Sequence, residues 1–180
     1  MRHYIKRILS IAFAVVAALA VQVAAAQAAV TDVTLKDVQT IVRTVGFLEN
    51  ASNTGSVMAI IYNPNSDESL QNARQMERLL RSEKKDIEPR LVSVSNMAGI
   101  EGARFAFISS DVQNHYNSIK TALSKNKILS FTLDRACVDQ NCCTIYINSK
   151  GRVEIIINKA VADDIQAKFK PVFLMMVTVI

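Results

Sequence analysis

Apolar residues along the chain alternate between a helical spacing and short continuous runs. Residues 34–50 repeat apolar side chains at intervals of three and four, which predicts a helix, and Thr34 and Asp37 have capping-box spacing at its start. Four apolar runs predict buried strands, at residues 56–62, 90–95, 103–109 and 127–133. Helical spacing returns between them, with Ser66 placed to cap a helix on Leu70, Ala73, Met76, Leu79 and Leu80, and Ser109 or Ser110 placed to cap a helix over residues 110–126.

The order of these elements predicts the fold class. Strands and helices alternate, and the connections are long enough for parallel crossovers. This favours an α/β fold with a mostly parallel twisted sheet and helices on both faces, a Rossmann-like three-layer sandwich. Two later strand-like runs flank the polar turn "NSKG" and predict an antiparallel hairpin. Residues 159–171 predict a short helix, which Pro171 interrupts, and residues 172–180 predict an apolar C-terminal helix packed on the sheet or on another subunit.

The first 28 residues have the three parts of a secretory signal peptide. A basic start is followed by an uncharged apolar stretch, and "AQA" then places small residues at both positions that a signal peptidase reads. A retained membrane anchor is the alternative, but the stretch is alanine-rich and no basic stop-transfer cluster follows it. We therefore expect residues 1–28 to be removed and residues 29–180 to form a single domain in the periplasm.

Removal of that segment changes the charge of the chain. The full sequence has 21 Lys and Arg residues against 16 Asp and Glu residues, and three of the basic residues precede residue 29. The remaining chain thus has 18 basic and 16 acidic residues, a net charge of only +2. So small an excess gives no reason to expect a nucleic acid as partner or insertion of the mature chain into a membrane.

Little in the expected domain indicates catalysis. His115 is its only histidine and stands mid-helix in "QNHYN", so neither a serine triad nor a multi-histidine metal site is indicated. We expect no enzymatic activity and no cofactor.

Two polar loops are the candidates for ligand binding, because sheets of this class bind ligands at the carboxyl ends of their strands. Asn63, Asn65 and Ser66 follow one predicted strand, and Ser109 and Ser110 follow another. The simpler interpretation of both loops is a polar turn with an ordinary helix cap.

A cluster of three cysteines lies just before the predicted hairpin, at Cys137, Cys142 and Cys143. A structural zinc site needs four ligands and a thioredoxin-type centre needs C-x-x-C, so a local disulfide is the default in an oxidising compartment. Strand alternation along "CCTIYIN" would bury Cys143 with Ile145 and turn Cys142 toward the loop that carries Cys137. We therefore expect a Cys137–Cys142 disulfide, with Cys143 as the alternative partner. The remaining thiol is either buried and inert or joins two subunits.

Three stretches of the mature chain form a pattern found in a known family. They are the positions Lys150-Gly151-Arg152-Val153, Ile155, Ile157-Asn158 and Ala160 of the C-terminal third, the segment "IEGARFAFIS", residues 100–109, and the triplet Phe47-Leu48-Glu49. With these stretches the mature part of the chain resembles the YfiR/HmsC-type periplasmic proteins. A tryptophan of the family after the first helix is replaced by Asn50, and Asn141-Cys142 stands where many members have a glycine pair.

The resemblance implies a non-catalytic periplasmic regulator. Proteins of this type bind the periplasmic sensor domain of a membrane-bound diguanylate cyclase and inhibit it, which lowers cyclic-di-GMP signalling and biofilm formation. Such inhibition requires only that the regulator favour the inactive state of the cyclase. The apolar C-terminus "VFLMMVTVI" additionally suggests a homodimer.

Two further function classes remain open at the level of sequence. One is a periplasmic small-ligand binding domain, similar to half of a solute-binding protein, that uses the loops at Asn63 and Ser109. The other, less favoured, is a thiol oxidoreductase built on the cysteines.

Overall fold

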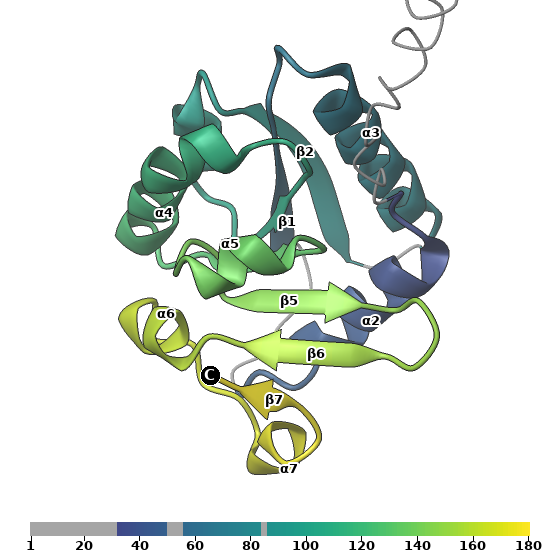
Figure 1. Ribbon diagram of the computed structural model, residues 1–180, viewed down its shortest axis with the longest axis vertical. Coiled ribbons are helices and arrows are strands. Elements are labelled where there is room, and N and C mark those ends of the chain that lie inside the picture. The colour runs from purple at the N-terminus through teal and green to yellow at the C-terminus, as the bar shows by residue number, and fades with distance from the viewer. Residues whose placement is uncertain (1–31, 50–55, 84–85) are drawn as a thin grey trace, which may run out of the picture. The chain divides into compact units, whose positions relative to one another are not determined.

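The computed structural model describes residues 32–49, 56–83 and 86–180, which fold around a seven-stranded sheet (Figure 1). The strands are β1 Ser56–Tyr62, β2 Ile87–Ser93, β3 Phe105–Ile108, β4 Leu129–Thr132, β5 Ile145–Asn148, β6 Glu154–Ile157 and β7 Thr178–Val179. The helices are α2 Leu35–Val45, α3 Asp67–Ser82, α4 Tyr116–Lys125, α5 Arg135–Asp139, α6 Lys159–Asp164 and α7 Pro171–Leu174, with the 3-10 helices η1 Met97–Ile100 and η2 Gln113–His115.

The sheet is mostly parallel, and its strands lie in the order β2-β1-β3-β4-β5-β6-β7. β1 pairs in parallel with β2 and β3, and the parallel pairing continues through β4 to β5. β5 and β6 form an antiparallel hairpin with Ile145 opposite Ile157. The predicted α/β class and the predicted hairpin are both confirmed.

The winding of the sheet reverses at β1, because β2 is added on one side of it and β3 on the other. In parallel sheets of this kind the crevice for a ligand lies outside the carboxyl ends of the two strands at this switch point. The loops that follow β1 and β3 occupy this place.

Helices cover both faces of the sheet and form two separate apolar cores. One core contains Ile41 of α2, Met76 of α3 and Phe105 of β3, and the other contains Ile119 of α4 and Val138 of α5. These five side chains are buried, and for Ile41, Met76 and Ile119 the helical spacing of apolar residues predicts this. The result is the three-layer arrangement that the alternation of elements predicts.

Polar side chains determine where the first two long helices begin. The Thr34 side chain accepts a hydrogen bond from the backbone N–H of Asp37, whose carboxylate accepts one from the Thr34 N–H, so the predicted capping box is confirmed. The Ser66 side chain accepts from the Ser69 N–H at the start of α3, also as predicted.

The expected cap of α4 is wrong. Neither Ser109 nor Ser110 caps this helix, whose N-cap position is His115 and has no side-chain hydrogen bond. Asp111 has a φ of 55°, so the chain turns there, and η2 separates the turn from the helix. The left-handed turn at Asp111 and the following η2 therefore occupy the positions at which the helix was expected to start, and α4 begins only at Tyr116.

The expected C-terminal helix is also wrong in its extent. Pro171 begins α7 instead of interrupting a helix, because the first helical position has no need of a backbone N–H. Only four residues are helical, and the chain then extends into β7, which pairs in parallel with β6. The Ile180 N–H donates to the Ile157 carbonyl at 2.9 Å, so backbone pairing with the sheet replaces the predicted helix.

Residues Thr31–Ile180 form one compact unit. The predicted signal peptide, residues 1–28, lies outside the described residues. None of the helices in the described ranges has the length and apolar character that crossing a membrane requires.

Candidate functional site

A pocket of about 530 Å³ lies between α4 and α6. In the view of Figure 1 both helices lie at the left, with α4 above the level of β5 and α6 beside the end of β6. The apolar walls of the pocket are formed by Leu123, Ile128, Ala160, Val161 and Ile165. Its polar floor is formed by Ser130, Cys142 and Thr144. Its polar and charged rim is formed by Lys120, Ser124, Asn141 and Asp164. Its volume falls in the range of about 300–1,000 Å³ that is typical of small-molecule sites.

One hydroxyl group on the floor of the pocket has a proton for which the described residues provide no acceptor. The Ser130 hydroxyl oxygen accepts from the Thr144 backbone N–H at 2.8 Å, and the two hydroxyl oxygens lie 3.2 Å apart. One of the two O–H groups donates within this pair. The other O–H has no acceptor among the described residues, and both side chains are buried. A buried hydroxyl without an acceptor is stabilised by a hydrogen-bonding ligand.

The rim of the pocket has one cation that is not paired. Among the residues that the structure describes, no carboxylate forms an ion pair with Lys120. Asp164, in contrast, accepts a hydrogen bond from the Ser124 hydroxyl through its carboxylate and one from the Lys127 ammonium through its backbone carbonyl. Asp164 therefore has hydrogen-bond partners within the protein, whereas Lys120 has no ion-pair partner among the described residues.

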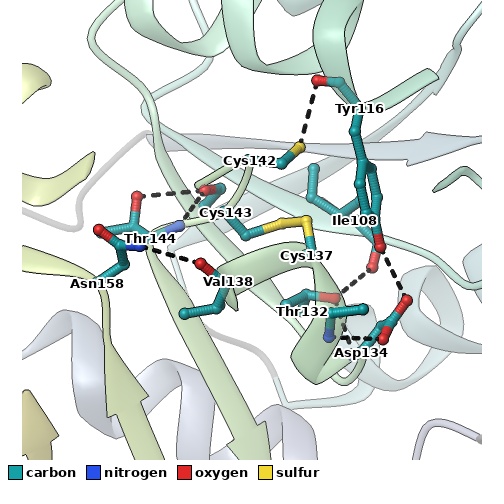
Figure 2. The surroundings of a disulfide bond; sticks show 12 residues. Ile108, Tyr116, Thr132, Asp134, Cys137, Val138, Cys142, Cys143, Thr144 and Asn158 are labelled. Carbon is teal, nitrogen blue, oxygen red and sulfur yellow. Dashed lines mark hydrogen bonds between the residues drawn. A yellow bond between two sulfur atoms is a disulfide. The ribbon is translucent and has the colours of Figure 1, made fainter. Parts of the chain in front are cut away.

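A disulfide joins Cys137 to Cys143, and Cys142 is a buried free cysteine (Figure 2). The expected Cys137–Cys142 pairing is therefore wrong, and the alternative partner forms the bond. The expectation extended the alternation of β5 back to Cys142, but the strand begins at Ile145. Asn141, with a φ of 55°, turns the chain at the end of α5. Both following backbone N–H groups then donate to the Cys137 carbonyl, so neither cysteine follows the strand period.

Helix α5, which the sequence interpretation missed, positions the disulfide. Asp134 caps this helix by accepting a hydrogen bond from the Ala136 N–H at 3.0 Å. The Asp134 carboxylate also accepts from the Tyr116 hydroxyl at 2.8 Å, which ties α5 to α4. Burial, followed by this hydrogen bond, raises the pKa of Tyr116. An aspartate at the N-cap and an asparagine just after the last turn are typical helix boundaries, so the sequence "DRACVDQN" is sufficient to indicate this short helix.

The free thiol of Cys142 lies on the floor of the pocket and is directed away from the disulfide. Figure 2 shows its sulfur pointing toward the Tyr116 carbonyl oxygen, 3.5 Å away. Burial raises the pKa of the Cys142 thiol to about 12, although the nearby Lys120 charge acts in the opposite direction. The thiol is therefore protonated at neutral pH, which makes it a poor nucleophile.

The cysteine cluster has a limited chemistry in this state. The three sulfur atoms lie within 4.8 Å of one another, which is close enough for a shared metal ion. The disulfide, however, withdraws two of the three sulfurs as thiolate ligands. A redox centre of the thioredoxin type is equally disfavoured, because its attacking thiol has a lowered pKa and that of Cys142 is raised.

The two predicted ligand loops meet at the switch point of the sheet. The Asn63 side chain donates from its amide nitrogen to the Asp111 carbonyl at 3.1 Å and accepts from the Asn65 N–H at 3.0 Å. The two loops are therefore neighbours in the structure. Whether they bind a ligand stays a prediction.

A chain of hydrogen bonds connects the two loops below their surface. The Asn63 N–H donates to the Ser69 hydroxyl oxygen, which lies 2.8 Å from the Ser109 hydroxyl oxygen. The Ser109 hydroxyl donates to the Ile61 carbonyl, also at 2.8 Å. Ser66 is engaged as the cap of α3. Most polar groups of the predicted ligand loops therefore satisfy one another.

Ser110 and His115, which the sequence also singles out, differ in their surroundings. The Ser110 hydroxyl oxygen is buried and has no hydrogen-bond partner among the described residues. His115 is partly exposed at the end of η2 and stands at the N-cap of α4, not in the middle of a helix.

A scan against protein-family models found no match, and a search of curated proteins found no relative. Solved structures, in contrast, share the fold. An ABC domain from Streptococcus pneumonia in complex with L-Trp is similar with a TM-score of 0.60 and 11% identity, over 81% of this chain and 62% of that one. A conserved domain protein from Vibrio cholerae O1 biovar El Tor has a TM-score of 0.61 and 14% identity, over 82% and 60%.

A third solved structure is the ligand-free, open form of a substrate-binding protein with adhesive properties from Clostridium difficile. It is similar with a TM-score of 0.62 and 9% identity, over 82% of this chain and 60% of that one. The chain therefore has the fold found in substrate-binding proteins, and it spans about 60% of the length of these three structures.

Proposed function

We propose that this chain is a non-catalytic, extracytoplasmic binding domain that holds a small molecule in the pocket between α4 and α6. The observation that carries the proposal is a pocket of about 530 Å³, with polar groups left over on its floor and rim, in a fold shared with substrate-binding proteins. The switch-point loops are the weaker candidate site, because Asn63, Ser69 and Ser109 are hydrogen-bonded to one another and to the backbone, which leaves the buried Ser110 hydroxyl oxygen as the group without a partner among their described residues.

The cysteines support a location outside the cytoplasm. A disulfide between Cys137 and Cys143 is stable in an oxidising compartment and rare in the cytosol. The predicted signal peptide would deliver the chain to such a compartment. Both features are those expected of a periplasmic binding protein.

A thermal-shift screen against a broad set of small metabolites tests the proposal. A ligand that binds only the folded state raises the melting temperature, and at a hundred times its Kd it stabilises by about 2.7 kcal/mol. The variant Ala160→Trp should abolish the shift, because the indole ring would fill the mouth of the pocket from an exposed position.

The control for this screen is Lys159→Trp, which places the same ring on α6 beside the pocket, at an exposed position that does not line it. This variant should keep the shift. A screen in which no metabolite stabilises the chain, or in which Ala160→Trp responds like the wild type, would contradict the proposed site.

A second candidate function is supported by the C-terminal surface. Apolar side chains of α7, β7 and the residues between and after them are exposed: Val172, Leu174, Met175, Met176, Val179 and Ile180. Exposed apolar groups that gather in one segment are typical of a surface that binds another protein. On the resemblance to YfiR/HmsC-type proteins, the partner would be the periplasmic sensor domain of a membrane-bound diguanylate cyclase, or a second copy of the chain.

Affinity capture from detergent-solubilised membranes tests this second candidate. Recovery of a membrane protein with a GGDEF domain by the wild-type chain, and its loss with Met175→Lys and Met176→Lys combined, would support it. Met175 and Met176 are 79% and 61% exposed, so the substitutions should leave the fold intact. Capture that is unchanged by both substitutions would rule out this surface as the binding site.

A further inference from the structure

We infer that the pocket between α4 and α6 selects an amphipathic carboxylate, whose apolar body lies between the two helices and whose carboxylate is held by Lys120 and the hydroxyl pair on the floor. This inference rests on the proposed function and names the chemical class of its ligand. Several polar groups of the pocket have no partner within the described part of the chain.

The walls favour an apolar body. Leu123 of α4, Ile128 before β4 and Ile165 after α6 are buried, and each presents an aliphatic side chain to the same hollow. An aliphatic or aromatic ligand removes this surface from water, which contributes about 25 cal/mol for each Å² of apolar surface. A fully polar ligand such as a free sugar would leave these walls unmatched.

The polar groups that remain available are mostly donors. The spare O–H of the Ser130–Thr144 pair can donate but has no acceptor in the described part of the chain. The Asn141 side chain uses its oxygen to accept from Asn158 at 2.7 Å, which leaves its NH₂ group as a further donor at the rim. A carboxylate accepts several hydrogen bonds at once, so it satisfies donors that a hydroxyl or an ether satisfies only in part.

The positive charge of Lys120 at the rim also favours an anionic ligand. Lys120 lines the pocket and has no ion-pair partner among the described residues. The opposite charge, Asp164, is already engaged with Ser124, and the Lys127 ammonium lies against its backbone carbonyl. The site therefore favours an anionic ligand over an ammonium ligand.

Three probes of equal length separate the ligand classes: octanoate, octanol and octylamine. Binding is followed by ¹H–¹⁵N NMR on the full chain with its disulfide intact. Octanoate should shift the amide resonances of residues that line the pocket, and it should bind about tenfold more tightly than octanol and more tightly still than octylamine. An exposed ion pair contributes modestly, so Lys120→Met should weaken octanoate about fivefold and leave octanol unchanged.

A matched control is Lys125→Met, which removes the same charge from the same helix at an exposed position that does not line the pocket. It should leave the affinity for octanoate unchanged. Equal affinities for the three probes, an unchanged octanoate affinity in Lys120→Met, or octanoate shifts confined to the C-terminal apolar residues would each overturn the carboxylate assignment.

The failure of this inference differs from the failure of the proposed function. If octanoate leaves the pocket resonances unmoved while neutral or cationic fragments of a diverse set shift them, the ligand class is wrong and the pocket remains a binding site. If no probe and no fragment shifts these resonances, the proposed function fails as well.

Discussion

The pocket between α4 and α6 and the loops at the switch point are both rich in polar side chains, but they use them differently. At the switch point Asn63, Ser69 and Ser109 form a continuous hydrogen-bonded chain that ends on the Ile61 carbonyl. In the pocket Lys120 has no ion-pair partner in the described ranges, and the Ser130–Thr144 pair retains an O–H group.

The difference lies in how many of the polar groups are already hydrogen-bonded within the protein, and this bears on binding. A group that is satisfied inside the protein gains little from a ligand, because binding only exchanges one hydrogen bond for another. A group that lacks a partner gains the whole interaction. The proposed binding role of the pocket rests on this contrast, and the Ser110 hydroxyl, which has no partner among the described residues, is the exception at the switch point.

The largest effect that tests this comparison concerns Cys142, the thiol on the pocket floor. Its pKa is raised to about 12 by burial, so the reactive thiolate is scarce at neutral pH and its population rises tenfold with each pH unit below the pKa. Alkylation by iodoacetamide should therefore become about a hundredfold faster between pH 7 and pH 9. The rate is measured by mass spectrometry of the native chain, with octanoate present and absent.

The control for this measurement is the chain unfolded in urea, in which the thiol has its ordinary pKa of about 8.5 and the rise should flatten near pH 9. Octanoate should slow the reaction of the native chain, and Ser109→Ala should not change it. A native rate that already levels off below pH 9 would show that the pocket floor is more open to water than the structure indicates.

The next effect comes from the disulfide that closes the loop carrying Asn141 and Cys142. Replacing both Cys137 and Cys143 by Ala should lower the free energy of unfolding by about 2 kcal/mol, because a closed loop of this length restricts the unfolded chain. Urea unfolding measures the loss. Hydrogen exchange should accelerate in the loop around Cys142 but not in the switch-point loops, and Cys142→Ala serves as the control with the disulfide intact. Uniform acceleration in both regions would remove the distinction between them.

A smaller change in stability should distinguish Ser109 from Ser110, two adjacent serines at the switch point. Ser109→Ala should cost about 1 kcal/mol of stability, because its hydroxyl bonds both to Ser69 and to the Ile61 carbonyl. Ser110→Ala should be close to neutral, since its hydroxyl oxygen has no partner in the described part of the chain. Thermal unfolding of the two variants provides the comparison. The opposite order of stabilities would contradict the structural role given to the Ser109 hydrogen bonds.

The smallest effect is expected for the bridge between the two loops at the surface. Asn63→Ala removes the hydrogen bond to the Asp111 carbonyl and should lower the free energy of unfolding by about 0.5 kcal/mol. Asn65→Ala is the matched control, because Asn65 is exposed and contributes only its backbone N–H. Octanoate affinity should be unchanged in both. A loss of octanoate affinity in Asn63→Ala would couple the two regions that the structure keeps apart.

Part of the fold follows directly from local sequence. Thr34 with Asp37 and Ser66 with Ser69 identify the starts of two helices, since capping depends only on residues a few positions apart. The hairpin of β5 and β6 was predictable for the same reason, as Gly151 supplies the left-handed turn residue with a φ of 76°. The C-terminal residues were misassigned because a short apolar run fits a helix and a strand equally well.

The candidate site was predictable only in fragments. The cysteine cluster and the polar loops were visible in the sequence, but Lys120, Ser130 and Thr144 carry no motif. They come from α4, β4 and the residue before β5, and only the packing of α6 against these elements turns them into one pocket. Chemistry assembled from elements far apart in the sequence leaves no local pattern.

The sequence by itself determined the α/β class, the parallel sheet with its final hairpin and the presence of a local disulfide, because periodicity, capping and cysteine spacing act over a few residues. The tertiary structure decided which cysteine is free and where the pocket lies. Asn141 turns the chain after α5, which directs Cys143 to Cys137 and Cys142 toward α4. That choice depends on the contacts of α5 and α4 across the Tyr116–Asp134 hydrogen bond, which no local pattern encodes.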